Sequence, residues 1–281
     1  MAHPALVPDA VAVITGGASG IGLAAARAFA ERGMRVCIAD LGADRLEQAT
    51  AAIAAVASRD AVMGVETDVS RQGDLVALER AVRDRFGGTD VLMNNAGIAP
   101  ASKALGPPGS WERLLAVNLW GVVHGTQVFV PGMLSRGRPG LIINTGSKQG
   151  ITTPPGNPAY NVSKAGVKVF TEALQHELRN TPGAQLAAHL LVPGFVFTGL
   201  TAGGRTDKPA GAWTPEQTVT FMIERIEAGD FYILCPDGET TRGLDEKRIL
   251  WAAGDLVENR PPLSRWHPAW GEAFAAFARR S

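Results

Sequence analysis

Short apolar runs alternate with longer amphipathic stretches along most of the chain. The apolar runs are rich in Val, Ile, Leu and Ala, and they cover residues 11–15, 36–39, 61–65, 91–93, 141–144, 186–192 and 231–234. The intervening stretches repeat apolar positions at helical spacing, at residues 21–32, 44–57, 74–86, 111–130, 159–178 and 215–227. Strands that are apolar on both faces are typical of a parallel sheet covered by helices on both sides. The pattern therefore predicts an α/β fold with a doubly wound, seven-stranded parallel sheet and helices on both faces.

This alternation stops near residue 235, so we expect one domain over residues 1–235 and a C-terminal helical extension over residues 236–281. The periodicity of the extension predicts two further helices, at residues 244–258 and 270–279. Three of the six tryptophans lie there: Trp251, Trp266 and Trp270. The interpretation we favour is that they pack the extension onto the same domain or onto a partner subunit. The alternative is that some of them line a substrate pocket as part of a lid.

Composition and charge exclude several classes of function. Lys+Arg and Asp+Glu both number 27, so the net charge is zero and we expect neither a nucleic-acid nor a membrane partner. The N-terminus lacks a signal-type segment, and no uninterrupted apolar run approaches the roughly 18 residues that span a bilayer. Cys37 and Cys235, the only cysteines, both lie in apolar strand-like segments and are expected to be buried free thiols. The five histidines are scattered, so no metal site is expected. From the features of the N-terminus, the apolar runs and the cysteines, the chain is predicted to be cytoplasmic.

A glycine-rich loop joins the first predicted strand to the first predicted helix. Its candidate cofactor-binding residues are Gly16, Ser19, Gly20, Ile21 and Gly22. Glycines allow the backbone to turn tightly and to approach a pyrophosphate, whose charge the helix N-terminus stabilises. A plain tight turn is the alternative interpretation of this segment.

Asp40 ends the second predicted strand, about 20 residues after the glycine-rich loop. An acidic group at this position can accept hydrogen bonds from the adenosine ribose and would repel a 2′-phosphate. The next residue is Leu41, and no Arg or Lys stands beside it in the sequence. We therefore expect NAD as cofactor, with NADP less favoured. The alternative is that Asp40 is only a loop acid, which could cap the following helix.

Two further polar segments follow the third and fourth predicted strands. Their candidate cofactor-binding residues are Asp68, Val69, Asn95, Ala96 and Gly97. Ligands of doubly wound sheets bind at the carboxyl ends of strands, and Asp68 could accept a hydrogen bond from the adenine amine. Turn formation explains the same residue types equally well.

Tyr160 and Lys164 are four residues apart in a predicted helix and therefore share one face. A tyrosine titrates near pH ~10, and a neighbouring ammonium stabilises its phenolate, so the pair can act as a general acid and base. Ser147 ends the fifth predicted strand and could hold a substrate carbonyl beside Tyr160. Taken alone, a tyrosine and a lysine at this spacing most often belong to an exposed helix face.

In combination, these motifs are far more specific. The glycine-rich loop, Asn94-Asn95-Ala96-Gly97, Ser147 and Tyr160-x-x-x-Lys164 occur in one order along the chain. This ensemble resembles the short-chain dehydrogenase/reductase family over roughly residues 8–235. The resemblance implies a Rossmann-type fold and an NAD(P)-dependent alcohol dehydrogenase or ketone reductase.

The resemblance also implies a role for each matching residue. Tyr160 would be the general acid and base. Lys164 would bind the nicotinamide ribose and lower the pKa of Tyr160, and Ser147 would orient the carbonyl oxygen. Asn118 matches the asparagine that holds a water for proton relay. The segment beside the nicotinamide carboxamide would comprise Pro193, Gly194, Val196 and Thr198.

Substrate recognition is predicted for the segment of residues 195–213, which corresponds to the mobile substrate loop of the family. The candidate substrate residues are Phe195, Phe197, Leu200 and Trp213, together with Lys148 and Gln149 after the catalytic serine. The run of residues 144–150 and the long tail resemble a branch that acts on bulky benzylic alcohols and ketones.

A small-molecule substrate and a homodimer, with a tetramer as alternative, complete the expectation. Two other functions remain open on this fold: a lyase or isomerase that retains NAD, and a non-catalytic NAD-binding scaffold.

Overall fold

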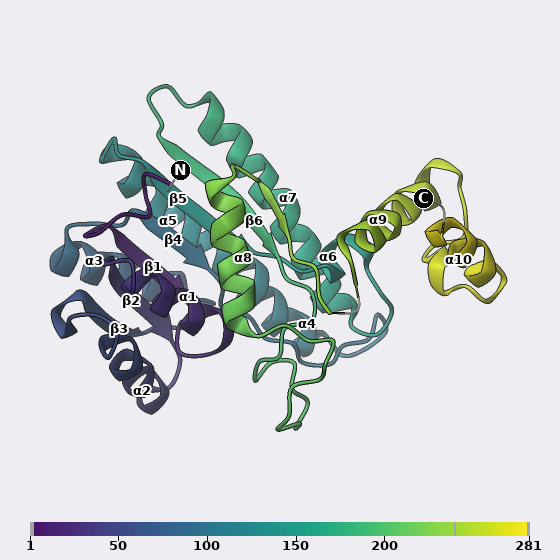
Figure 1. Cartoon of the computed structure of the whole chain (residues 1–281), viewed down its shortest axis with the longest axis horizontal. Coiled ribbons are helices and arrows are strands. Elements are labelled where there is room, and N and C mark those ends of the chain that lie inside the picture. Colours follow the sequence, from purple (N-terminus) through teal and green to yellow (C-terminus); the bar gives the residue numbers. More distant parts are fainter. Residues whose placement is uncertain (1–2, 239, 280–281) are drawn as a thin grey trace.

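The computed structural model describes residues 3–238 and 240–279 of the chain. Its centre is a seven-stranded sheet in the order β3-β2-β1-β4-β5-β6-β7, and every paired neighbour is parallel (Figure 1). The strands are β1 Val11–Thr15, β2 Arg35–Asp40, β3 Val62–Glu66, β4 Val91–Asn94, β5 Gly140–Thr145, β6 Leu186–Val192 and β7 Tyr232–Leu234. The order reverses between β1 and β4, as in a Rossmann-type doubly wound sheet. All seven predicted strands are confirmed.

Helices cover both faces of the sheet. The helices are α1 Gly20–Ala30, α2 Ala43–Ala54, α3 Gln72–Phe86, α4 Pro108–Leu115, α5 Gly121–Ser135, α6 Gln149–Thr152, α7 Pro158–Asn180, α8 Pro215–Glu227, α9 Arg242–Val257 and α10 Gly271–Arg279. Buried residues of α1, α2 and α8 pack on one face, and those of α3, α5 and α7 pack on the other. Alternate strand residues divide between the two cores, because successive side chains of a strand point to opposite faces.

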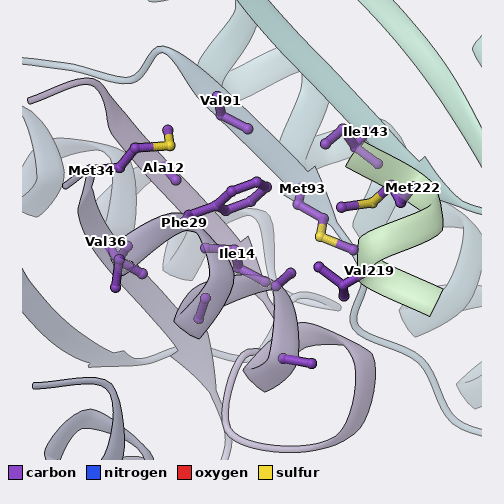
Figure 2. Close-up of a cluster of buried hydrophobic side chains, with 14 of the residues drawn as sticks. Ala12, Ile14, Phe29, Met34, Val36, Val91, Met93, Ile143, Val219 and Met222 are labelled. Atoms are coloured by element: carbon purple, nitrogen blue, oxygen red, sulfur yellow. The ribbon is translucent and has the colours of Figure 1, made fainter. Parts of the chain in front are cut away.

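The core under α1 and α8 illustrates this packing. Phe29 of α1 is fully buried, and Met222 of α8 reaches the same cluster from the other side of the view in Figure 2. Strand residues complete the cluster: Ala12, Ile14, Val36, Val91, Met93 and Ile143. Cys37 and Cys235 are buried free thiols, as predicted.

The predicted helix over residues 111–130 is longer than expected. Helices α4 and α5 are joined by a π-helical turn, Ala116–Trp120, and α5 continues through Pro131 to Ser135. The combined stretch Pro108–Ser135 is the one described helix long and apolar enough to cross a bilayer. Its buried residues pack on the sheet and on α3 and α7, which accounts for its apolar composition. The short helix α6 was not predicted from the sequence.

The C-terminal extension projects from the end of the molecule that carries α6 and lies away from α1, α2 and α3 (Figure 1). Trp251 of α9 is buried in a small aromatic core, with ring centroids 5.3 to 6.3 Å from Trp270, Phe274 and Phe277. The guanidinium carbon of Arg260 lies 4.0 Å from the Trp251 ring centroid. The extension therefore has its own core and contacts the domain through α6 and α9.

Candidate active site

A cavity of about 520 Å³ opens at the carboxyl ends of the central strands. Most residues predicted to bind cofactor or to act in catalysis line it: Gly16, Ser19, Gly20, Ile21, Asp40, Asp68, Val69, Asn95, Ala96, Gly97, Ser147, Tyr160, Lys164, Pro193, Gly194, Val196 and Thr198. Leu200 lines the same cavity. Residues from six separate loops are thus brought together at the switch point of the sheet, where such folds bind ligands.

The glycine-rich loop forms one wall of the cavity. Gly16 has a φ of 66°, and a Cβ there would lie 2.8 Å from the Ala96 Cα. Gly22 does not line the cavity, because it faces the loop itself, where a Cβ would lie 2.2 Å from the Gly16 carbonyl oxygen. Helix α1 begins at Gly20, and the Ser19 side chain makes no capping hydrogen bond to it. The first amides of α1 thus keep their capacity to bind an anion.

Asp40 lies beside this loop and does not cap α2, whose N-cap is Gly42. Its carboxylate accepts hydrogen bonds from the backbone N–H of Ala18 at 3.0 Å and of Leu41 at 2.8 Å. Arg45, in the first turn of α2, lies 3.4 Å from the same carboxylate and also lines the cavity. The expectation that no basic side chain stands beside Asp40 is therefore wrong, because the first turn of α2 places Arg45, five positions later in the sequence, next to the Asp40 carboxylate.

Asp68 after β3 and Asn95 after β4 both line the cavity and form hydrogen bonds within or between the loops. Asp68 accepts hydrogen bonds from the backbone N–H and the hydroxyl of Ser70, at 3.0 and 2.6 Å. Asn95 donates through Nδ2 to the carbonyl oxygens of Thr15 and Gly16, at 3.2 and 3.3 Å. Its Oδ1 accepts from the Thr145 hydroxyl at 3.3 Å. Asn95 thus joins the glycine-rich loop to the end of β5.

Tyr160 lies in the first turn of α7, whose N-cap Asn157 accepts a hydrogen bond from the Tyr160 backbone N–H at 3.4 Å. Pro158 occupies the first helical position, where its missing N–H has no cost. The Ser147 hydroxyl lies near Tyr160 and lowers the pKa of its phenol. The acid/base candidate and the candidate orienting hydroxyl therefore line the same cavity.

Lys164 follows one helical turn later and is buried. Its Nζ donates to the Thr145 carbonyl oxygen at 2.8 Å and lies 5.8 Å from the Tyr160 ring centroid. Burial lowers the pKa of Lys164 from 10.5 to about 8. Burial raises the pKa of Tyr160 above its usual 10.0, and the nearby Ser147 hydroxyl acts in the opposite direction. This rise is opposite to the lowering that the sequence predicted, because desolvation outweighs the favourable contacts of the phenolate.

Asn118 is fully buried in the π-helical turn and does not line the cavity. Its side chain pairs with the backbone of Ile98, accepting at 2.8 Å and donating at 2.9 Å. A Cβ on Gly97 would lie 3.5 Å from its Oδ1 and 3.9 Å from the Lys164 Nζ. Asn118 therefore fixes the loop after β4 close to Lys164, and π-helical turns of this kind frequently occur at functional sites.

Of the predicted substrate residues, only Leu200 lines the cavity. Val196 pairs with Trp213 in a short parallel bridge and lines the cavity, whereas Phe195 and Phe197 on either side of it do not. Trp213 packs against Phe221 of α8, with centroids 5.7 Å apart.

The two residues after Ser147 also lie outside the cavity. Gln149 is exposed. Lys148 points to Asp237 and Asp245, with its Nζ 3.2 and 2.6 Å from their carboxylates, and so does not face the predicted pocket. Its side chain therefore connects the β5 end to the C-terminal extension.

Several lining residues were missed in the sequence, among them Arg45, Arg113, Thr145 and Thr201. The Trp residues of the extension do not line the cavity either. Within residues 3–238 and 240–279, no three His, Cys, Asp or Glu side chains gather as possible metal ligands. The described site thus offers hydroxyl, ammonium, carboxylate and backbone N–H groups for its chemistry.

Comparison with known proteins agrees with this geometry. A family model described as short chain dehydrogenase matches residues 10–209. The chain belongs to the short-chain dehydrogenase family. The 2-(R)-hydroxypropyl-CoM dehydrogenase of Xanthobacter autotrophicus is 36% identical to this chain over 203 residues, which cover 71% of this chain and 79% of that enzyme. The 1-deoxy-11-beta-hydroxypentalenate dehydrogenase of Streptomyces exfoliatus is 31% identical, over 91% of this chain and 93% of that enzyme.

A solved structure extends the likeness of this short-chain dehydrogenase to three dimensions. A short-chain dehydrogenase/reductase from Burkholderia phymatum in complex with NAD superposes with a TM-score of 0.82 at 31% identity. The match covers 92% of this chain and 97% of that one.

Proposed function

We propose that this short-chain dehydrogenase transfers a hydride between NAD and a secondary alcohol or ketone, with Tyr160 as general acid and base. The observation that carries the proposal is the convergence of Ser147, Tyr160 and Lys164 on one cavity whose far end holds Asp40. A non-catalytic scaffold would not require Ser147, Tyr160 and Lys164 together, because each of them serves proton transfer or charge stabilisation at an alcohol oxygen. A lyase or isomerase that retains NAD would use the same residues, and release of free NADH distinguishes it from the proposed dehydrogenase.

The residues at the other end of the cavity fit NAD. The glycine-rich loop leaves a cradle that side chains would fill, and the first amides of α1 can bind the pyrophosphate. Asp40 can accept hydrogen bonds from the adenosine ribose. The NAD in the Burkholderia relative supports the same choice. NADP stays the less favoured cofactor, although Arg45 lies close enough to bind a phosphate.

The chain's own groups would then act on the proton. Bound NAD supplies the hydride acceptor, and its reduced form supplies the donor. Ser147 would orient the substrate oxygen toward Tyr160. In ketone reduction, Tyr160 would donate its phenol proton to the forming alkoxide, and in alcohol oxidation its phenolate would accept the hydroxyl proton. Lys164 would stabilise the phenolate electrostatically and hold the cofactor ribose.

We further propose that the substrate is bulky or aromatic and that the protein works in the cytoplasm as a homodimer, with a tetramer as the alternative. Exposed apolar side chains on the helical surface support self-association; Trp120 is 51% and Val169 62% exposed. Light scattering at micromolar concentration tests the assembly, because a monomer mass would contradict the proposal.

The decisive assay follows NADH absorbance at alkaline pH with NAD or NADP and a panel of aliphatic, alicyclic and aryl secondary alcohols. We expect turnover with NAD and the highest kcat/KM for a bulky aryl alcohol. A preference for small aliphatic alcohols would contradict the substrate proposal. No turnover with any alcohol, although NADH binding is detected by fluorescence, would contradict the dehydrogenase proposal and favour a lyase or a scaffold.

A further inference from the structure

Lys148 directly follows the catalytic serine, yet its side chain points away from the cavity into a buried ionic cluster. Its Nζ lies 2.6 Å from Asp245 Oδ2 and 3.2 Å from Asp237 Oδ2. The side chains of Lys148, Asp237 and Asp245 are only 14%, 11% and 5% exposed. An ammonium shared by two buried carboxylates has a defined position, because leaving any of the three charges unpaired in the interior is costly.

The cluster lies directly behind the segment Pro193–Phe195, of which Pro193 and Gly194 line the cavity. Asp237 Oδ2 accepts a hydrogen bond from the Phe195 backbone N–H at 3.3 Å. A Cβ on Gly194 would lie 2.5 Å from that oxygen and 3.0 Å from the Lys148 Nζ, so the backbone touches the ion pair. The Lys148 backbone N–H also donates to the Pro193 carbonyl oxygen at 3.4 Å. Movement of the cluster would therefore displace the ends of both β5 and β6.

The C-terminal extension supplies the anionic side of the cluster. Asp237 follows β7 and Asp245 lies in the first turn of α9, where a carboxylate is also favoured by the helix dipole. Arg248, one turn later, donates to the Thr240 hydroxyl at 3.2 Å and lies 3.8 Å from Asp245. Two cations thus balance two carboxylates, and α9 is anchored to the segment that carries Ser147.

We propose that Lys148 is a positioning residue: paired with Asp237 and Asp245, it uses the C-terminal extension to hold Ser147 and the Pro193–Phe195 segment in place. This inference rests on the proposed dehydrogenase function, since those two segments contact the reacting groups. The extension is then a structural support of the active site, although none of its described residues, 236–238 and 240–279, lines the cavity.

The test compares Asp245→Asn, which removes one charge at constant shape, with Asp255→Asn as matched control. Asp255 is also in α9 and pairs with Arg260 at 3.1 Å, but it faces the extension's own core and not Lys148. We expect Asp245→Asn to lower kcat by about tenfold or more, because small displacements of positioned groups have large effects on rate. The Kd for NADH should change less than about threefold, and Asp255→Asn should keep kcat within about twofold. Lys148→Arg, which retains the charge, should recover most of the activity that Lys148→Met loses.

Hydrogen exchange supplies a readout that does not depend on turnover. Peptides covering residues 145–150 and 193–197 should exchange faster in Asp245→Asn and remain at the wild-type rate in Asp255→Asn. Unchanged exchange in these peptides, or an unchanged kcat, would overturn the inference. Faster exchange in a chain whose wild type oxidises no alcohol would support the positioning role and reject the dehydrogenase proposal alone.

Discussion

The buried ammonium of Lys164 is expected to lower the stability of this protein in exchange for function, and Lys164→Met tests this. Burial lowers the pKa of Lys164 from 10.5 to about 8, so the folded chain disfavours the charged form by about 3 kcal/mol. Methionine has a similar length and no charge to desolvate. It would leave the Thr145 carbonyl oxygen without its 2.8 Å donor, at a cost of about 1 kcal/mol. We therefore expect a net gain of about 1 to 2 kcal/mol at neutral pH, together with loss of activity.

The pH dependence follows from the direction of the shift. A folded pKa below the unfolded one means that the unfolded chain binds the proton more tightly, so the destabilisation is complete below about pH 8. It disappears as the pH rises from about 8 toward 10.5, where Lys164 becomes neutral in both states. The advantage of Lys164→Met over the wild type should therefore be largest near pH 7 and shrink above pH 8.

Thermal unfolding between pH 6.5 and 9.5, followed by tryptophan fluorescence, measures this difference. A gain of this size corresponds to roughly 3 to 6 °C in Tm for a chain of this length. Lys168→Met is the matched control, because Lys168 lies on the same helix, is partly exposed and pairs with Glu172 at 2.7 Å. A Lys164→Met variant that is less stable than wild type at pH 7, or a gain that does not shrink at higher pH, would refute the reasoning.

Three further predictions concern the proposed reaction. Tyr160→Phe should lower kcat by roughly 10²- to 10⁴-fold while NADH binding persists. Tyr232→Phe, the variant of the only other tyrosine in the sequence, is the control and should stay active. A Tyr160→Phe enzyme that works at near wild-type rate would exclude Tyr160 as the general acid and base. Because burial raises the pKa of Tyr160, alcohol oxidation should accelerate from pH 7 to 10, while ketone reduction proceeds well at neutral pH. Steady-state rates that show oxidation fastest at pH 7 would contradict the assignment of Tyr160 as the base. Asp40→Ala should raise the kcat/KM ratio of NADP to NAD by about tenfold or more, since repulsion of the 2′-phosphate is removed and Arg45 remains. The double variant Asp40→Ala/Arg45→Ala should lose most of that gain, and equal ratios in both would show that Arg45 does not contact the phosphate.

The sequence by itself determined the parts of this protein that depend on local pattern. Strand–helix alternation predicted all seven strands and their parallel arrangement, because a buried parallel strand requires apolar residues on both faces. The order of the motifs identified the family and placed Ser147, Tyr160 and Lys164 in one cavity. Such motifs can be found without coordinates, since each depends on a short spacing within one loop or one helix turn.

Only the tertiary structure decided how side chains distant in the chain meet. The turn into α2 brings Arg45 to Asp40, which adjacency in the sequence could not show. Lys148 follows Ser147, yet its side chain pairs with two carboxylates from the C-terminal extension and does not line the cavity. Desolvation is likewise a property of the packed environment, and so the pKa of Tyr160 rises where local spacing to Lys164 predicted a fall. Burial and charge pairing sum over all neighbours in space, which is why they became visible only once the chain was folded.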